Sequence, residues 1–345
     1  MNYRSITDLN DTIARNRWKL PHDVDIMVGI PRSGLLAANL LSLTLNVPMT
    51  DIEGLVAGRL LTAGRTRRRE GFSKATTEAK KIIVVDDSIF MGQAMREARG
   101  KLAGLGLNAE IIYCAVYGNS DQHPDCDVVL EAIAQPRMFQ WNVMHHGMLQ
   151  NCCVDIDGVL CCDPTEDEND DGPAYEKFLG SAFSLATPTK KIGWLVTSRL
   201  EKYRAHTETW LKERGIEYGQ LIMLDLPTKE ERLRSGAHGT YKANVYKSLA
   251  DAVLFIESEH RQAVEIARLS GKPALCTESQ QVIFPEGNSM IAMQQKIRTL
   301  PLRLRLAKTP ATNLQAMAVL VRKVLGNEAY GRLRRLVKRS SPRRA

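Results

Sequence analysis

The sequence predicts an α/β protein with two doubly wound parallel-sheet domains and a basic helical C-terminal tail. Apolar segments of strand length alternate with helical segments, first between residues 23 and 118 and again between 152 and 276. This order is typical of parallel sheets covered by helices. A chain of 345 residues can hold two cores, and 44% apolar and 25% charged residues are typical of a soluble globular protein. We place the domains at 1–148 and 149–290 and the tail at 291–345.

The first domain is expected to contain two strand-turn-helix units and a further strand. A strand, a turn with Pro and Gly, and an apolar helix are predicted for residues 23–49, DVDIMVGIPRSGLLAANLLSLTLNVPM. The same order is predicted for residues 80–106, KKIIVVDDSIFMGQAMREARGKLAGLG, and a strand for residues 109–118. Residues 57–74, AGRLLTAGRTRRREGFSK, are too polar and too rich in turn residues for a core element, so they predict a loop.

The second domain is expected to repeat this physical pattern. Strands are predicted within CCVDIDGVL (152–160), KKIGWLVTSRL (190–200) and IEYGQLIML (216–224), and DAVLFIESEHRQAVEIARLSGKPALC (251–276) predicts a strand and a helix. Ligands of such parallel sheets collect at the carboxyl ends of the strands. The polar residues at these strand ends are therefore the candidates for function.

Positive charge is concentrated in the tail. The net charge is +8, but residues 291–345 hold fourteen Lys and Arg against one acidic residue, and the rest of the chain holds 33 basic and 38 acidic residues. Apolar residues alternate with arginines at roughly helical spacing in the tail, a pattern typical of a helix on an anionic membrane surface. A helix packed on its own domain is the alternative, and contact with nucleic acid ranks third.

The compartment that the sequence predicts is the cytoplasm. No apolar run approaches the length of a spanning helix, and the first residues lack the apolar core of a signal peptide. We expect the tail to allow peripheral attachment at the inner face of the cell membrane, and a homo-oligomer is compatible with the sequence.

Asp86 and Asp87 follow the apolar strand residues IIVV and precede a turn at Gly92. Adjacent carboxylates repel one another and need partners, which vicinal sugar hydroxyls and a divalent cation can supply. The free N–H groups and the dipole of the following helix suit a phosphate. The stretch therefore predicts a site for a ribose phosphate, and a strand end with solvated aspartates is the alternative.

The stretch IIVVDDSIFMGQAM resembles the signature of type I phosphoribosyltransferases, which bind phosphoribosyl pyrophosphate (PRPP). VGIPRSGLLAA is similar to the pyrophosphate loop of this family, and Arg65–Arg69 occupy the interval of its mobile loop. The resemblance covers roughly residues 20–135 and implies Mg²⁺ as the cofactor. The residues that it assigns to PRPP are Arg32, Ser33, Gly34, Asp86, Asp87, Ser88, Met91, Gly92, Gln93 and Ala94.

This signature departs from the family around its glycine. The family commonly has Thr or Ser at the positions of Phe90, Met91 and Ala94. The phosphate would then be held by backbone amides, with Ser88 and Gln93 as the nearby side chains.

Asp155 and Asp157 lie two residues apart at the end of another predicted strand. Carboxylates at this spacing can divide the work of phosphate transfer, one attacking phosphorus and the other moving the proton. Later strand ends offer a hydroxyl for the phosphoryl group at Thr197, a cation at Lys242 and a metal-binding carboxylate at Glu257. Lys247 is an alternative to Lys242, and Glu259 is an alternative to Glu257.

This order resembles the haloacid dehalogenase-like (HAD-like) phosphatases over about residues 150–280. The resemblance implies Asp155 as the nucleophile, Asp157 as the general acid and base, and Thr197 and Lys242 as further catalytic residues. It places Mg²⁺ at Asp155, Asp157 and Glu257, with Asp155 and Glu257 as the side-chain ligands. The intervals between the motifs are too short for a large cap domain, so an open site and a bulky substrate are expected.

Together the two sites predict a bifunctional ribofuranosyltransferase. The first would transfer ribose 5-phosphate from PRPP to an acceptor, and the second would remove the 5-phosphate. The basic tail and the open phosphatase site favour a glycan of cell-envelope polysaccharide synthesis as acceptor. Two alternatives stay open, a nucleobase phosphoribosyltransferase coupled to a nucleotidase, and a non-catalytic regulator that senses PRPP.

Overall fold

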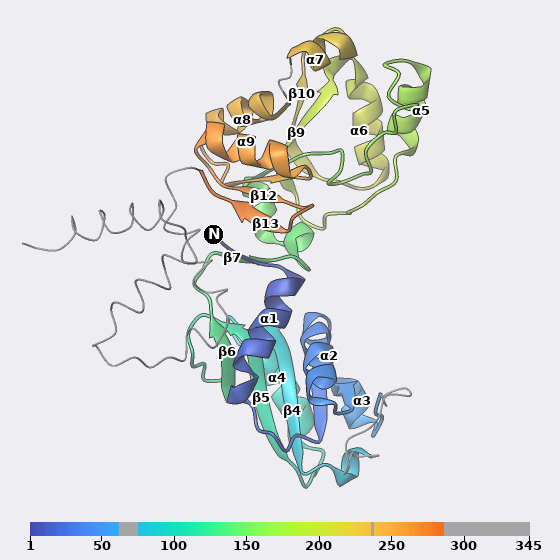
Figure 1. The fold of residues 1–345 in the computed structure, drawn as a ribbon. Coiled ribbons are helices and arrows are strands. Elements are labelled where there is room, and N and C mark those ends of the chain that lie inside the picture. Colours follow the sequence, from blue (N-terminus) through green and yellow to red (C-terminus); the bar gives the residue numbers. More distant parts are fainter. Residues whose placement is uncertain (62–74, 236–237, 286–345) are drawn as a thin grey trace, which may run out of the picture. The chain divides into compact units, whose positions relative to one another are not determined.

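The computed structural model describes residues 1–61, 75–235 and 238–285 (Figure 1). Arg65–Arg69 and the tail at 291–345 lie outside the described residues, as do the predictions made for them. The described residues form helices and largely parallel sheets, which confirms the α/β fold class. In these ranges no helix combines the length and the apolar character that crossing a bilayer requires.

The first large sheet has five parallel strands in the order β3-β2-β4-β5-β6. Its central strand β4 (Lys81–Ser88) carries the run IIVV, which is fully buried, as expected of a parallel strand covered on both faces. The other elements of this part are β1 (Asn2–Arg4), α1 (Ile6–Asn16), β2 (Ile26–Gly29), α2 (Ser33–Leu45), β3 (Met49–Asp51), α3 (Ile52–Val56), α4 (Gln93–Ala103), β5 (Glu110–Gly118), β6 (Val128–Ala132) and β7 (Arg137–Phe139).

Helices cover both faces of this sheet because successive strand residues point to opposite sides. Ile83 and Val85 pack in one apolar cluster with α1 and α2, whereas Ile82 and Val84 pack in another with α3 and α4. Burying each such side chain stabilises the fold by about 1.5–3 kcal/mol. The last residue of β2, Gly29, lies opposite Val85, so the turn after β2 begins beside the acidic end of β4.

The second large sheet has the strand order β10-β9-β8-β11-β12-β13. All neighbouring pairs are parallel except β12 and β13. Its elements are β8 (Cys152–Val154), α5 (Pro173–Ser181), β9 (Ile192–Leu200), α6 (Arg204–Glu213), β10 (Tyr218–Leu224), α7 (Lys229–Ser235), α8 (His238–Ser248), β11 (Leu254–Glu257), α9 (His260–Ser270), β12 (Ala274–Cys276) and β13 (Gln281–Ile283).

This sheet is also covered on both faces. Val154 and Ile256 pack in the cluster that includes residues of α5 and α6, and Cys153 and Phe255 pack in the cluster formed with α8 and α9. Val154 lies opposite both Leu195 of β9 and Ile256 of β11. The carboxyl ends of β8, β9 and β11 therefore meet at one edge of the sheet.

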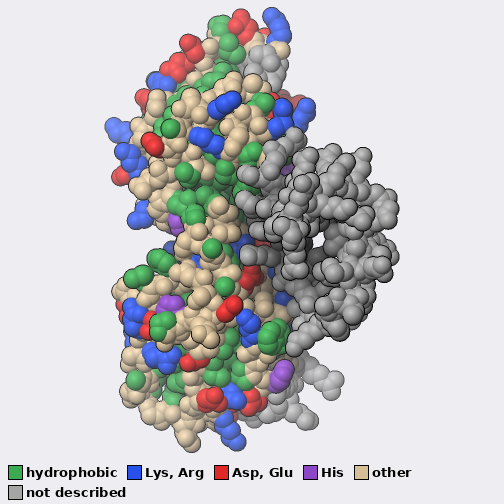
Figure 2. All heavy atoms as spheres, turned by 90° about the vertical axis from the view of Figure 1, so that its left-hand side faces the viewer, with side chains coloured by type: hydrophobic (Ala, Val, Ile, Leu, Met, Phe, Trp, Pro, Cys, Tyr) green, Lys and Arg blue, Asp and Glu red, His purple; other side chains and the backbone are tan. Residues whose placement is uncertain are grey.

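Some elements are absent from the prediction. The parallel pair β1–β7 and the antiparallel strand β13 each consist of three residues per strand, too few to show a periodic pattern. The two sheets occupy the ranges predicted for the two domains, whose boundaries stay predictions. On the face shown in Figure 2, basic and acidic side chains are interspersed over the described surface, in accord with a sequence whose positive excess belongs to the tail.

Candidate functional sites at two strand-end edges

The acidic pair at the end of β4 is unequally exposed. Asp86 is half-buried, whereas Asp87 retains 4% of its surface. The Ser33 hydroxyl donates to Asp87 Oδ1 at 2.7 Å, and the Trp141 indole N–H donates to Oδ2 at 2.7 Å. Asp87 therefore has a protein partner for each oxygen.

Asp86 occupies a less favourable environment for a charge. Burial, together with the negative charge of Asp87, raises the pKa of Asp86 to about 8. A Cβ on Gly34 would lie 3.1 Å from Asp86 Oδ1 and 2.7 Å from Val85 O, so glycine permits the turn after β2 to approach this carboxylate closely. The structure thus brings Ser33 and Gly34 together with the acidic pair, while Arg32 is exposed at the start of α2.

The turn after β4 has the form of an anion-binding helix start. Gly92 adopts φ +73° and is the N-cap of α4. The Arg96 guanidinium donates to Met91 O at 2.9 Å, and His123 Nε2 lies 3.2 Å from Phe90 O, so the turn is fixed through its carbonyls. Among the described residues, none accepts a hydrogen bond from the backbone N–H groups of Met91–Ala94. Such N–H groups at a helix N-terminus are suited to a phosphate.

The side chains around this turn offer little to a phosphate. Phe90 and Met91 are 55% and 70% exposed. The Gln93 amide donates to Glu97 at 2.8 Å, Ser88 is half-buried at the end of β4, and Ala94 is exposed in the first turn of α4. Backbone N–H groups are therefore the main donors that this turn could offer to a phosphate.

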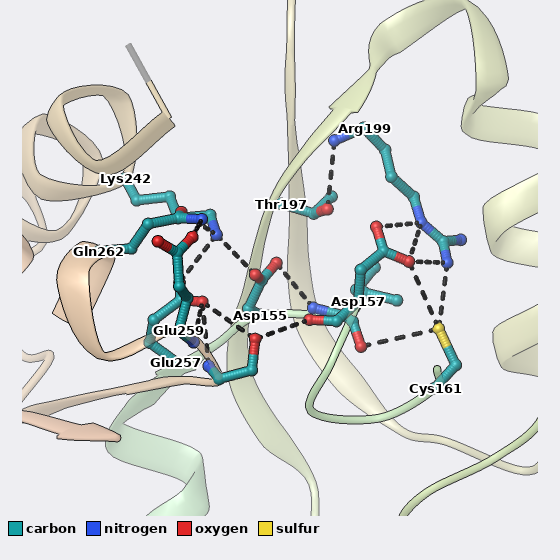
Figure 3. A network of polar contacts seen from close by, with 11 residues as sticks. Asp155, Asp157, Cys161, Thr197, Arg199, Lys242, Glu257, Glu259 and Gln262 are labelled. Atoms are coloured by element: carbon teal, nitrogen blue, oxygen red, sulfur yellow. Dashed lines mark hydrogen bonds and ion pairs between the residues drawn. The ribbon is translucent and has the colours of Figure 1, made fainter. Parts of the chain in front are cut away.

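At the second edge, Lys242 links two buried carboxylates (Figure 3). Its Nζ lies 2.5 Å from Asp155 Oδ2 and 2.7 Å from Glu257 Oε2, and it also donates to Gln262 Oε1 at 3.0 Å. Asp155 follows β8, Glu257 ends β11, and Lys242 projects from α8. All three charged side chains are at least nine-tenths buried.

The electrostatics of this cluster are dominated by burial. Burial raises the pKa of Asp155. The positive charge of Lys242 lowers this pKa, whereas the negative charges of Glu257 and Asp157 raise it further. Burial alone would lower the pKa of Lys242, but Asp155 and Glu257 outweigh it and raise the pKa. The cluster therefore holds a permanent ammonium group and carries excess negative charge.

Asp157 is turned toward another cation. Arg199, at the end of β9, donates from Nη2 to Asp157 Oδ1 at 2.6 Å and from Nε to Oδ2 at 3.0 Å (Figure 3). Burial would raise the pKa of Asp157, but the charge and hydrogen bonds of Arg199 hold it below its usual value. In this arrangement both oxygens of Asp157 accept hydrogen bonds from Arg199.

A cavity of about 320 Å³ opens at this edge, with Asp155, Thr197, Lys242 and Glu257 in its lining. Thr197 is fully buried, and its hydroxyl accepts from the Arg199 backbone N–H at 3.2 Å. The rival residues are placed differently. Lys247 is exposed on α8, and the exposed Glu259 accepts from Gln262 Nε2 at 2.6 Å.

The side chains at this edge that could hold a hard divalent cation are Asp155 and Glu257. In the described ranges no three His, Cys, Asp or Glu side chains converge as a ready metal cage. Asp155 and Glu257 supply two carboxylates in an excess of negative charge, and Ser258 Oγ lies 3.5 Å from the Asp157 carbonyl, which brings that carbonyl to the same edge. Oxygen donors of this kind suit Mg²⁺, which keeps several waters when bound. The Asp157 side chain is paired with Arg199, so its carbonyl is the Asp157 oxygen that could join this set.

Two residues in these sites were not assigned a role from the sequence. Arg199 belongs to the TSR stretch, and a guanidinium at the end of an apolar strand is a signal that could have identified it. Trp141 lies 54 residues from Asp87 in a segment without periodicity, so no sequence signal links the two.

Three solved phosphoribosyltransferase structures are similar to part of this chain. The Helicobacter pylori xanthine-guanine-hypoxanthine enzyme is 15% identical, with a TM-score of 0.30, over 41% of this chain and 92% of its own. The Pyrococcus horikoshii purine enzyme is 18% identical, with a TM-score of 0.28, over 41% of this chain and 92% of its own. The Aeropyrum pernix orotate enzyme is 17% identical, with a TM-score of 0.22, over 32% of this chain and 55% of its own. No protein-family model and no protein with a curated description matches the sequence.

Proposed function

We propose that this protein is a bifunctional ribofuranosyltransferase. It transfers ribose 5-phosphate from PRPP to an acceptor at the edge around β4, and it removes the 5-phosphate at the edge around β8. The observation that carries the phosphatase half is the contact of the Lys242 ammonium with both Asp155 and Glu257 in a cavity that also includes Thr197. The acidic end of β4 and the N–H groups of Met91–Ala94 carry the transferase half.

In the first reaction the bond between C1 of the ribose and pyrophosphate breaks, and a bond from C1 to an acceptor oxygen or nitrogen forms. The transition state resembles an oxocarbenium ion, so stabilising the leaving group matters more than a protein nucleophile. The 5-phosphate rests on the turn at Gly92, and the sugar hydroxyls lie at the acidic strand end. Ser33 and Gly34, in the turn after β2, face the pyrophosphate.

In the second reaction an Asp155 oxygen attacks phosphorus, the bond to the ribose 5-oxygen breaks, and that oxygen takes a proton from Asp157. Water then attacks the acyl phosphate, and Asp157 accepts its proton. Lys242 holds Asp155 in place and offsets charge on the phosphoryl oxygens, to which Thr197 donates a hydrogen bond. Mg²⁺ held by Asp155, Glu257 and the Asp157 carbonyl would supply further charge compensation.

The two reactions together deliver a plain ribofuranosyl group. Removal of the phosphate makes the transfer effectively irreversible, since the transferase site must bind the 5-phosphate for the reverse reaction. For the acceptor we propose a glycan of cell-envelope polysaccharide synthesis. This proposal is supported by the basic tail of the sequence and by the short segments between the phosphatase motifs. In the described ranges the first segment contains α5, and the second contains α6, β10 and α7, in place of a cap domain.

The proposal is tested by incubating the wild type and Asp155→Asn with PRPP, Mg²⁺ and either glycan or nucleobase acceptors, and weighing the products. We expect a pentose increment on a glycan from the wild type and a pentose-phosphate increment from the variant. Identical products from both proteins would refute the phosphatase half. A mass increment on nucleobases alone would favour the alternative function, a nucleobase phosphoribosyltransferase coupled to a nucleotidase. No increment with any acceptor would favour a non-catalytic regulator that senses PRPP.

A further inference from the structure

The two aspartates at the end of β4 have different surroundings. Successive residues of a strand point to opposite faces, and here Asp86 is half-buried while Asp87 is 4% exposed. Each Asp87 oxygen accepts a hydrogen bond at 2.7 Å, one from Ser33 and one from Trp141. A carboxylate held in this way is directed at the protein and has little surface left for a ligand.

The partners of Asp87 come from two separate segments. Ser33 is the first residue of α2, in the turn that follows β2. Trp141 follows β7, and its ring stacks on Phe139 with centroids 4.9 Å apart and planes 8° apart. Phe139 in turn stacks on Tyr117 of β5 at 5.3 Å. Asp87 therefore fixes the N–H edge of an indole whose face is already packed.

A buried cation accompanies this arrangement. Arg137 is 5% exposed, and its Nη2 donates to Ile89 O at 2.6 Å in the turn that follows β4. Its Nη1 is buried and has no hydrogen-bond acceptor in the described part of the chain. Burial lowers the pKa of Arg137, and the negative charge of Asp87 opposes this effect. The negative charge of Asp87 thus favours the charged form of a buried guanidinium with which it makes no direct ion pair.

We propose that Asp87 is a positioning residue, which holds the Ser33 hydroxyl and the Trp141 indole in place, and that Asp86 is the carboxylate that meets the sugar hydroxyls. This inference rests on the proposed phosphoribosyl transfer. It replaces the expectation that both aspartates hold the sugar. Ser33 then keeps a fixed orientation toward the leaving pyrophosphate, and Trp141 forms a fixed wall beside the sugar.

The test compares Asp86→Asn, Asp87→Asn and Trp141→Phe with the wild type. Calorimetry measures the affinity for Mg²⁺-PRPP, and pyrophosphate release with water as the acceptor measures turnover. At pH 9, where Asp86 is ionised, Asp86→Asn should weaken PRPP binding about tenfold or more, because it removes hydrogen bonds to a charged group. Asp87→Asn and Trp141→Phe should bind PRPP within about threefold of the wild type and turn over about tenfold more slowly, since a misplaced group lowers the rate of the chemical step.

Coupling between the residues sharpens the test. Because Asp87 and Trp141 act through one hydrogen bond, the double variant Asp87→Asn/Trp141→Phe should be little slower than either single variant. A merely structural bond would lower the thermal midpoint and leave turnover of the folded protein unchanged, which would overturn the inference. Loss of PRPP binding in Asp87→Asn equal to that in Asp86→Asn would overturn it as well. If Asp87→Asn does not fold, Trp141→Phe carries the same comparison, and a wild type that binds no PRPP would refute the proposed function itself.

Discussion

Arg199 Nη2 lies 2.6 Å from Asp157 Oδ1, and the side chain of Arg199 has no exposed surface. The guanidinium also donates to Thr207 at 3.3 Å and lies 3.2 Å from Cys161 Sγ, so its N–H groups are used within the protein. A buried pair of this kind contributes little relative to an apolar pair, but removal of one partner leaves the other charge uncompensated.

Arg199→Met should therefore be strongly destabilising. We expect the free energy of unfolding in urea to fall by about 3–5 kcal/mol, because Asp157 is left without its counter-ion. The double variant Arg199→Met/Asp157→Asn should regain part of this loss, which a double-mutant cycle would measure. Lys101→Met, which breaks an exposed pair with Glu53, is the control and should not differ measurably from the wild type. Equal stability of Arg199→Met and this control would contradict the prediction.

Lys242→Met should impair phosphate release and leave pyrophosphate release intact. The loss of a fixed cation at the nucleophile should slow the phosphatase step by about 10²–10³-fold, as does the loss of one electrostatic group in other active sites. Lys247→Met is the matched control from the same helix, since Lys247 is exposed. The two products are assayed separately after incubation with PRPP, Mg²⁺ and acceptor. A similar effect of both substitutions would show that the wrong lysine has been assigned.

Gly92→Ala should weaken PRPP binding. Gly92 has φ +73°, and a Cβ there would clash with the Asp125 carboxylate, so the turn must shift its N–H groups. We expect an affinity loss of about tenfold, comparable to losing hydrogen bonds to a charged ligand. Gly100→Ala is the control within α4, because its Cβ meets no atom within 4 Å. That variant should keep its affinity and gain about 0.5–1 kcal/mol of stability from helix propensity. Unchanged affinity in Gly92→Ala would place the phosphate elsewhere.

The affinity for PRPP should rise with pH. Sugar hydroxyls donate to an ionised carboxylate, and Asp86 in the folded protein has a pKa of about 8, compared with 3.8 for an unperturbed group. The affinity for PRPP should therefore increase by up to about tenfold per pH unit below pH 8. The pH profile of Asp86→Asn is subtracted from that of the wild type, and this subtraction removes the contribution of the ligand's own titration. Because the folded state binds this proton more tightly, Asp86 also makes the free energy of unfolding decline between about pH 4 and 8. Parallel pH profiles of the two proteins would contradict the assignment.

The sequence predicted the fold class and the strand ends because these depend on local order. Apolar strands followed by turns and helices define two edges, one with Asp86 in the first sheet and one with Asp155 in the second, and the structure confirms the α/β fold with parallel sheets. The choice between Lys242 and Lys247 was open in the sequence, since both follow the same motif in one helix. The register of α8 against β8 and β11 brings Lys242 to Asp155.

The partners of the carboxylates could not be predicted because they are distant in the sequence. Arg199 and Asp157 are 42 residues apart, and Trp141 and Asp87 are 54 apart. Motif spacing suggests which acidic residues lie at the same edge of a sheet. The hydrogen bonds that make the surroundings of Asp87 different from those of Asp86 depend on tertiary packing. The unequal environments of these two aspartates are therefore visible only in the structure.

The most direct test of the two-step account is phosphorus NMR of PRPP incubated with the full chain, Mg²⁺ and a glycan acceptor. The account predicts that pyrophosphate and orthophosphate appear in equal amounts, that both appear faster with the acceptor than without it, and that Asp155→Asn abolishes the orthophosphate signal alone. Release of orthophosphate without pyrophosphate, or an unchanged orthophosphate signal in Asp155→Asn, would contradict it.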